Sequence, residues 1–251
     1  MKIYRFLHAG KPSIGVADDG RIIRYSGSDA MAIGAATGDS ISLADAELLA
    51  PVTPSKIVAV GRNYAEHAKE LGNEAPSEPI IFLKPPTAVL DPTGTIVRPS
   101  QSQRVDFEGE LAIVIGRSAR NIRRDDWRGV VLGFTCANDV TARDLQKKDV
   151  QFTRGKSFDT FLPLGPCIET DLDPAALSLR TRVNGETKQD GNTRDMVFDC
   201  GAIIEFITAV MTLNPGDVIL TGTPAGVGPL NAGDQVEVEI EGIGVLRNRV
   251  A

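Results

Sequence analysis

Three acidic residues occupy alternate positions directly before a run of five apolar residues. They are Asp106, Glu108 and Glu110, and the run is Leu111 to Ile115. In a strand, residues two apart point to the same face, so Glu108 and Glu110 would project side by side. An apolar run of this kind is typical of a strand buried on both faces, where a carboxylate is costly unless a cation neutralises it.

A second apolar run ends about thirty residues later at Asn138-Asp139. We therefore predict an oxygen-ligand metal site formed by Glu108, Glu110 and Asp139. The alternative is that these acids are ordinary exposed positions of an alternating strand. That alternative fits poorly, because the strand continues into five consecutive apolar residues.

Histidine and cysteine are too few to hold a different kind of metal site. The chain has two histidines and three cysteines without close spacing, which argues against a His-rich zinc site and a disulfide framework. Oxygen ligands remain, so Mg²⁺ is the expected ion, with Mn²⁺ or Ca²⁺ as alternatives.

Composition sets the broad class of the protein. With 251 residues, 42% of them hydrophobic and 24% charged, the chain can form one large domain with a small appendage. The net charge of −6 and the scattered basic residues argue against a nucleic-acid partner. No signal-peptide core or membrane-length apolar stretch is evident, so we expect a cytoplasmic protein with no membrane partner.

Residues 1–50 are predicted to form a small N-terminal β-rich region, and residues 51–251 the main domain, which begins near Pro51 and Pro54. The N-terminal region should hold short strands and a helical turn from Ser42 to Leu49. In the main domain we expect mostly strands: Ile57 to Val60, Ile80 to Leu83, Glu108 to Ile115, Val130 to Ala137, Leu164 to Ile168, Val218 to Leu220, Gln235 to Ile240 and Val245 to Val250.

Three local patterns stand out within the main domain. Asn184-Gly185 lies between two strand-like segments and predicts a tight hairpin, because both turn positions need positive φ. An apolar stripe from Cys200 to Leu213 predicts one long helix, which Pro215 would stop. A shorter, polar helix is expected from Tyr64 to Leu71.

Five segments, in order and with regular spacing, resemble the fumarylacetoacetate hydrolase family. They read VGRNYAEH from Val60, DFEGEL from Asp106, NDVTARD from Asn138, GKSFD from Gly155 and TGTP from Thr221. The resemblance spans about residues 55 to 250. It implies a mainly β protein with some α structure, a mixed β-sandwich roll or open barrel with a short lid helix and one long helix. It also implies a homodimer and a divalent ion held by the two glutamates and the aspartate.

One departure from the family bears on the reaction. The fumarylacetoacetate hydrolases themselves have a further acid seven residues before the catalytic histidine, where this chain has Val60. The departure argues against the namesake reaction. It favours the smaller bacterial relatives, which include acylpyruvate hydrolases, oxaloacetate decarboxylases and hydroxymuconate-type isomerases.

His67 and Glu70 are candidates for a general-base pair. Three residues apart on a helix, they are neighbours, so the carboxylate can fix the imidazole tautomer. An ordinary surface pair is the alternative for these two residues taken alone, and the resemblance favours catalysis. Lys156 is either a solvated lysine or a fixed positive charge beside the substrate. Its glycine and phenylalanine neighbours and its family position favour the second interpretation.

Further residues are predicted to bind substrate. Arg143 and Gln146, four and seven residues after Asp139, have spacings that share a helical face, although Arg143 could equally pair with Asp144 or Asp149. The loop from Thr221 lacks the ending of a phosphate-binding loop, and its expected role is to bring the Thr223 hydroxyl to the substrate. The remaining candidates are Arg62, Tyr64 and Asp195.

The predicted function is Mg²⁺-dependent hydrolysis of a C–C bond in a small 2,4-dioxo acid of the acylpyruvate type. His67 and Glu70 would activate water, and the metal would stabilise the enolate that is released. The alternatives at the same site are decarboxylation of oxaloacetate and isomerisation of a 2-hydroxyhepta-2,4-diene-1,7-dioate-type acid. A non-catalytic β-roll with a structural ion is the alternative from a different class.

Overall fold

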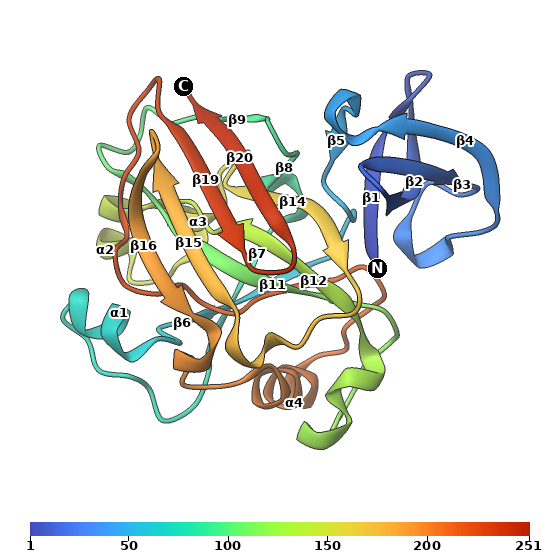
Figure 1. The fold of residues 1–251 in the computed structure, drawn as a ribbon. Coiled ribbons are helices and arrows are strands. Elements are labelled where there is room, and N and C mark those ends of the chain that lie inside the picture. The colour runs from blue at the N-terminus through green and yellow to red at the C-terminus, as the bar shows by residue number, and fades with distance from the viewer.

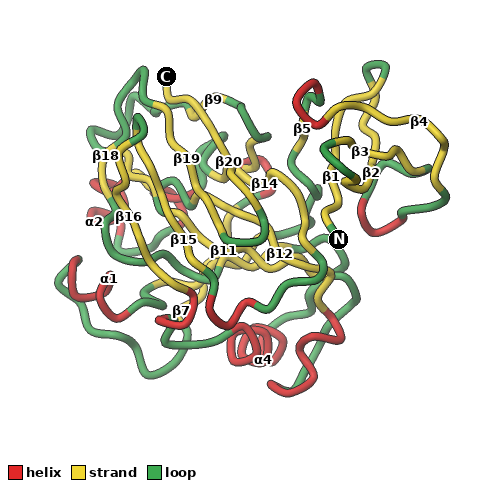
Figure 2. The backbone as a smooth tube through the Cα atoms, viewed as in Figure 1, coloured by secondary structure: helices red, strands yellow, loops and turns green.

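The structure, a computed structural model, describes residues 1–251 and consists mainly of β-strands in three sheets with four α-helices. Figure 2 shows how strands predominate over helices. The mainly β fold class is confirmed. None of the helices is long and apolar enough to cross a lipid bilayer.

The largest sheet has twelve strands and contains the strand that carries Glu110. Most of its strands follow one path, in the order β4 (Ala36–Ser42), β3 (Arg21–Tyr25), β2 (Lys11–Asp18), β1 (Lys2–His8), β14 (Leu162–Glu169), β12 (Val131–Asn138), β11 (Gly109–Ile115), β17 (Val218–Leu220), β6 (Ile57–Gly61) and β7 (Ile80–Lys84). Two short strands complete it, β5 (Leu48–Leu49) beside β1 and β8 (Val89–Leu90) beside β14.

Two smaller sheets complete the fold. The five-stranded sheet has the order β16 (Glu186–Asn192), β15 (Ser178–Val183), β19 (Gln235–Ile240), β20 (Gly244–Val250) and β9 (Thr95–Ile96), and the three-stranded sheet the order β13 (Thr141–Ala142), β10 (Val105–Phe107) and β18 (Gly228–Pro229). Figure 1 shows strands β15, β16, β19 and β20 in front of β11 and β12, with strands β1 to β5 set to one side. The first strand nevertheless joins the main sheet, because β1 pairs with β14.

Strand β11 is buried along its whole length. Leu111, Ile113 and Ile115 belong to a core that includes residues of the five-stranded sheet, whereas Ala112 and Val114 belong to a second core. Alternate side chains thus enter two different cores, as expected for a strand covered on both faces. This explains why no polar residue interrupts the run.

The helices are α1 (Ala65–Glu70), α2 (Arg143–Asp149), α3 (Thr153–Lys156) and α4 (Cys200–Val210). Helix α4 begins where the Asp199 carboxylate accepts a hydrogen bond from the amide of Ala202 at 2.8 Å. It ends before the predicted Leu213, because Leu213 pairs with the backbone of Ala119 instead. In Figure 1 this helix lies below the sheets.

Two other local predictions are resolved by the structure. The hairpin is confirmed, with Asn184 at φ 53° and Gly185 at φ 82°. The helical turn predicted from Ser42 to Leu49 is wrong in its extent. Only Leu43–Asp45 forms a 3₁₀ turn, and β5 follows it because Leu48 and Leu49 pair with β1.

Candidate active site

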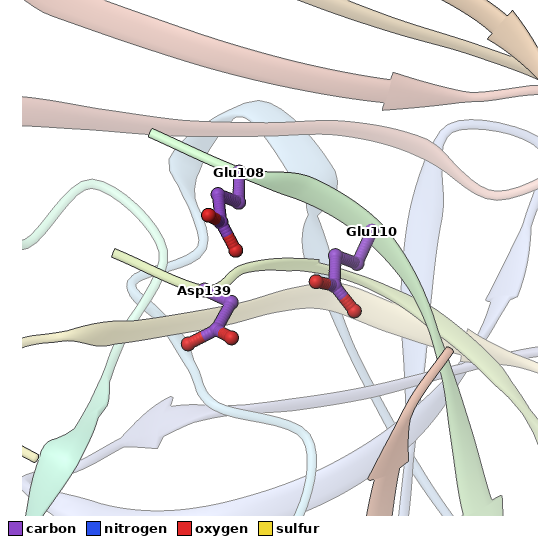
Figure 3. Close-up of side chains that lie close together, drawn as sticks. All are labelled: Glu108, Glu110 and Asp139. Carbon is purple, nitrogen blue, oxygen red and sulfur yellow. The ribbon is translucent and has the colours of Figure 1, made fainter. Parts of the chain in front are cut away.

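The register of strands β11 and β12 brings three carboxylates together. Gly109 pairs with Asn138, so Glu108 and Asp139 flank the same pair, and the Asp139 amide donates to the Glu108 carbonyl at 2.8 Å. Glu110 follows on β11. One ligand oxygen from each carboxylate lies within 4.8 Å of the others, and the three residues are at most 4% exposed. Figure 3 shows the three side chains gathered around one small space.

The cluster fits a hard divalent cation, because its donor atoms are carboxylate oxygens. Burial and the neighbouring carboxylates of Asp139 and Glu108 raise the pKa of Glu110 well above its ordinary value. Glu110 accepts a hydrogen bond from the Gly222 amide at 2.6 Å and, unlike Glu108 and Asp139, makes no ion pair with a lysine or arginine. A buried carboxylate with this environment is stabilised in its charged form when a cation binds beside it.

Lys156 lies against the same carboxylates. Its ammonium group donates to Glu108 Oε2 at 2.7 Å, to Asp139 Oδ2 at 2.6 Å and to the Thr141 hydroxyl at 2.8 Å. Burial acts to lower the pKa of Lys156, but the carboxylates of Asp139 and Glu108 outweigh burial and raise it. Lys156 is therefore a buried, charged member of the site, and the solvated-surface alternative does not describe its position.

Lys84 is a further member of the site that sequence reasoning missed. It ends β7, is 1% exposed, and donates to Asp139 Oδ1 at 2.6 Å and to the carbonyl of Lys156. Burial lowers its pKa, although the charge of Asp139 opposes the shift. The available sequence signal is a lysine that closes the apolar strand before Pro85, and such a lysine is usually exposed.

Arg143 begins helix α2 and connects the cluster to its surroundings. Its guanidinium donates to Glu108 Oε1 at 2.5 Å, to Asp106 Oδ2 at 3.0 Å and to Gln146 Oε1 at 2.8 Å. Burial acts to raise the pKa of Glu108, but Lys156 and Arg143 hold it below its ordinary value. Arg143 is thus held by Asp106 and Glu108.

Two details of the predictions for this segment need correction. Asp144 and Asp149, the alternative partners of Arg143, instead accept hydrogen bonds from Ser102 and Arg154 respectively. Asp139 does not share a helical face with Arg143 and Gln146, because strand β13 separates it from the start of α2.

His67 and Glu70 lie together on helix α1. Nδ1 of His67 is 3.2 Å from Oε2 of Glu70, and the Gly226 amide donates to both carboxylate oxygens of Glu70, at 3.1 Å and 3.3 Å. His67 is only 5% exposed. The contact leaves Nε2 as the ring nitrogen available to a substrate or water. A backbone anchor thus holds the glutamate, and the glutamate orients the imidazole.

A cavity of about 370 Å³ connects these groups. His67 lines it together with the three carboxylates, and so do Arg62, Arg143, Gln146, Lys156 and Thr223 among the residues predicted from the sequence. Its volume lies at the low end for ligand pockets, which suits a small metabolite. The structure thus places most of the predicted site residues around one space.

Tyr64 and Asp195 do not line this cavity. They line a neighbouring hollow of about 380 Å³ with Asp190 and Pro224, and the Tyr64 hydroxyl is buried without a hydrogen-bond partner. The cause is local, because Tyr64 pairs with the backbone of Met196 just before α1 begins. Neither residue is placed to touch a ligand in the main cavity.

Thr223 reaches the cavity but is also held by the protein. Its hydroxyl donates to the Gly109 carbonyl at 2.8 Å and accepts from Gln189 Nε2 at 2.7 Å. Gly109 lies between the two glutamates of the cluster. Thr223 and Gln189 therefore brace the segment that carries Glu108 and Glu110.

The fold and this cavity define an enzyme-like site, in which the imidazole of His67 and a cluster of three buried carboxylates line the same space. The family "Fumarylacetoacetate (FAA) hydrolase C-terminal" matches residues 56–251, and the family "Rv2993c-like, N-terminal" matches residues 1–51. The chain therefore belongs to the fumarylacetoacetate hydrolase family, as its sequence motifs predict, and it is an enzyme of that family.

Named relatives cover several reactions. The human mitochondrial oxaloacetate tautomerase FAHD2A is 48% identical over 215 residues, which cover 80% of this chain and 68% of the relative. A 2-hydroxyhepta-2,4-diene-1,7-dioate isomerase from Mycobacterium marinum has 46% identity and a TM-score of 0.92, covering 100% of this chain and 98% of that one. A maleylpyruvate hydrolase from Sphingobium sp. SYK-6 has 34% identity and a TM-score of 0.83, covering 100% and 99%.

Proposed function

We propose that the protein hydrolyses a C–C bond in a small 2,4-dioxo acid of the acylpyruvate type, with Mg²⁺ as its metal. The observation that carries the proposal is the position of His67, which Glu70 contacts, in the same cavity as three buried carboxylates and Lys156. A hydrolysis at this site needs a base for water and positive charge near the developing enolate, and the cavity holds both.

The residues of the chain support the following sequence of events. His67 Nε2 accepts a proton from a water molecule, which attacks the carbonyl carbon at position 4 of the substrate. The bond between carbons 3 and 4 then breaks, and its electron pair becomes the enolate of pyruvate. Protonation of carbon 3 by the imidazolium completes the release of pyruvate and the acyl group leaves as a carboxylic acid. Glu70 stabilises the imidazolium in the intermediate state.

Glu108, Glu110 and Asp139 are the residues that would hold the divalent ion. When bound, such an ion supplies Lewis-acid stabilisation of negative charge on the 2-oxo oxygen. Lys156 and Lys84 keep two of the ligand residues oriented through hydrogen bonds to Glu108 and Asp139. Arg143 orients Glu108 from the other side. These contacts fix the carboxylates before a substrate arrives.

Tautomerisation of oxaloacetate is the second candidate. It is favoured by the 48% identity to the human oxaloacetate tautomerase. Interconversion of keto and enol forms needs a base that moves a proton between carbon 3 and the 2-oxo oxygen, and His67 is also suited to that role. It needs no attacking water and releases no pyruvate.

The test is pyruvate release from acetylpyruvate and from oxaloacetate, measured side by side with Mg²⁺ and with excess chelator. Ultraviolet absorbance follows the enol form of oxaloacetate in the same samples. Chelator-sensitive pyruvate release from acetylpyruvate supports hydrolysis. Accelerated loss of the enol signal without pyruvate identifies a tautomerase, and pyruvate from oxaloacetate alone identifies a decarboxylase. The homodimer implied by the family resemblance remains a prediction, which sedimentation tests.

A further inference from the structure

One buried amide side chain is bound to two separate parts of the site. Gln189 lies on β16 and is fully buried. Its Oε1 accepts a hydrogen bond from the Gly109 amide at 3.0 Å, and its Nε2 donates to the Thr223 hydroxyl at 2.7 Å and to the Pro224 carbonyl at 2.8 Å. Gln189 thus joins the segment around Gly109 to the loop that begins at Thr223.

The segment around Gly109 carries two residues of the carboxylate cluster. Gly109 lies between Glu108 and Glu110 in the chain. Its amide donates to Gln189, and its carbonyl accepts a hydrogen bond from the Thr223 hydroxyl at 2.8 Å. Both polar groups of this peptide backbone are therefore held, and with them the backbone from which the two glutamates project.

The loop from Thr223 leads to the anchor of Glu70. The Gly226 amide donates to both carboxylate oxygens of Glu70. Gly226 packs directly on β16, because a Cβ atom there would overlap the Lys188 carbonyl oxygen and lie 3.3 Å from Cα of Gln189. Its φ of 99° is also a conformation that favours glycine. Strand β16 therefore sets the position of the amide that holds Glu70.

Glu70 depends on this anchor because its carboxylate is not enclosed. The side chain is 34% exposed and lines a side hollow of about 260 Å³ together with Lys147 and Arg104. A partly exposed carboxylate has rotamer freedom, and a cation in the same hollow attracts it. Without the Gly226 amide, Glu70 would be free to turn away from Nδ1 of His67, which lies 3.2 Å from it.

We infer that Gln189 is a positioning residue, which fixes Glu70 and through it the imidazole of His67 relative to the carboxylate cluster. The inference rests on the proposed function for the role of His67 as the base. Gln189 does not line the cavity, so it acts through the residues that it holds. Such a connection matters because a misplacement of about 1 Å at a site can cost about a hundredfold in rate.

The first test measures the tautomer of His67, which is possible because the chain has only two histidines. At about pH 8, where a free imidazole is neutral, ¹⁵N chemical shifts of labelled histidine distinguish the Nδ1–H tautomer from the Nε2–H tautomer. The contact with Glu70 predicts the Nδ1–H tautomer for His67 in the natural protein. The signals of His8 serve as the internal reference.

We expect Gln189→Met and Gly226→Ala each to give a mixture of the two tautomers at His67. Gly226→Ala keeps the Gln189 side chain and its contacts, so it tests the same connection if Gln189→Met does not fold. Gly228→Ala is the matched control, because a Cβ atom at Gly228 meets only the ring of Phe107, at the ordinary contact distance of 3.4 Å. The control should retain the Nδ1–H tautomer.

The second test is steady-state kinetics with acetylpyruvate at saturating Mg²⁺. Gln189→Met and Gly226→Ala should each lower kcat about tenfold, with KM within about twofold of the natural value. In a Glu70→Ala background the same substitutions should change kcat by less than about twofold, because the anchor then has no carboxylate to hold. A merely structural role would give the same loss in both backgrounds.

Two results would overturn the inference. One is a His67 spectrum that Gln189→Met leaves unchanged although the variant is folded, or that Gly226→Ala leaves unchanged. The other is a loss in kcat that persists in the Glu70→Ala background, because Gln189 would then act without Glu70.

The positioning role and the proposed hydrolysis fail in different ways. If the natural protein does not cleave acetylpyruvate, the proposed hydrolysis is wrong, and the spectra of His67 still decide whether Gln189 positions the imidazole. If the protein cleaves acetylpyruvate and both variants keep the natural spectrum and kcat, hydrolysis stands and the positioning role is wrong.

Discussion

Lys84 Nζ lies 2.6 Å from Oδ1 of Asp139, and both side chains are at most 1% exposed. The two residues are 55 positions apart in the chain. Lys156 contacts the other oxygen of the same carboxylate, also at 2.6 Å. Asp139 is therefore held between two buried ammonium groups, and its orientation toward Glu108 and Glu110 depends on them.

Removal of Lys84 should destabilise the metal-free protein. Lys84→Met leaves a buried carboxylate with one cation fewer, which we expect to lower the free energy of unfolding by about 3 kcal/mol. Added Mg²⁺ should restore part of the loss, because the ion neutralises the same carboxylate. Urea unfolding with and without Mg²⁺ measures both effects. Lys148→Met is the matched exposed control. An equal loss of stability in the two variants would argue against a stabilising ion pair between Lys84 and Asp139.

Substitution of His67 or Glu70 should slow catalysis and leave the affinity for the metal unchanged. His67→Ala removes the base and should lower kcat about a hundredfold to ten-thousandfold. Glu70→Gln should cost about tenfold, because the imidazole loses its charged partner but keeps its place. Steady-state kinetics measures the loss in kcat, and titration with Mn²⁺ measures the metal affinity. Glu66→Gln, exposed on the same helix, is the control, and an unchanged kcat in His67→Ala would exclude a catalytic role.

Gly109 should be required for the position of both glutamates. A Cβ atom at Gly109 would overlap the Thr181 hydroxyl and approach Gln189 Oε1 to 3.2 Å. Because both neighbours are fully buried, Gly109→Ala should lower the free energy of unfolding by about 1–3 kcal/mol and weaken Mn²⁺ binding. Gly129→Ala, which meets no atom within 4 Å, is the control. Unchanged stability and metal affinity in Gly109→Ala would show that the site tolerates a Cβ atom at this position, and would contradict the prediction.

Asp217 should make stability depend on acid pH. Its carboxylate is fully buried and accepts hydrogen bonds from the Ser55 hydroxyl at 2.6 Å and the Asn214 amide at 2.7 Å, besides an ion pair with Lys56. Burial acts to raise the pKa of Asp217, but the Asn214 amide, Lys56 and Ser55 outweigh burial and lower it. A lowered pKa means that the stabilisation is complete above the unfolded pKa of about 3.9 and is lost as pH falls through the folded value.

Asp217→Asn should therefore lower the free energy of unfolding by about 2 kcal/mol at neutral pH. The difference from the natural protein should begin to narrow below about pH 4, where Asp217 of the unfolded chain becomes protonated, and should be lost as pH falls through the lower pKa of the folded state. Urea unfolding across this pH range measures the difference. Asp126→Asn, at an exposed position, should show no such dependence. A difference between Asp217→Asn and the natural protein that stays constant with pH would contradict the assignment.

Local patterns predicted much of the fold. The apolar run at Leu111 to Ile115 indicated a strand buried on both faces, and the structure divides its side chains between two cores. Asn184-Gly185 indicated the hairpin, because its turn conformation depends only on these two residues. The end of α4 was predicted less well, since the backbone pairing of Leu213 with Ala119 is a tertiary contact.

The candidate site was likewise predicted only in part from the sequence. Glu108, Glu110 and Asp139 were found from their spacing and their apolar surroundings, and strand register brings them together. Lys84 was missed because its partner Asp139 becomes a neighbour only through sheet topology. Tyr64 lines the neighbouring hollow instead of the cavity of His67, because sequence does not specify which of two adjacent hollows a side chain lines.

The claim on which this account depends is that the three carboxylates hold one divalent ion, and titration with Mn²⁺ monitored by electron paramagnetic resonance tests it most directly. We predict one bound Mn²⁺ per chain that Mg²⁺ displaces, and loss of this binding in Glu108→Gln/Glu110→Gln with the fold retained by circular dichroism. Absence of stoichiometric binding, or undiminished binding in the double variant, would contradict the account.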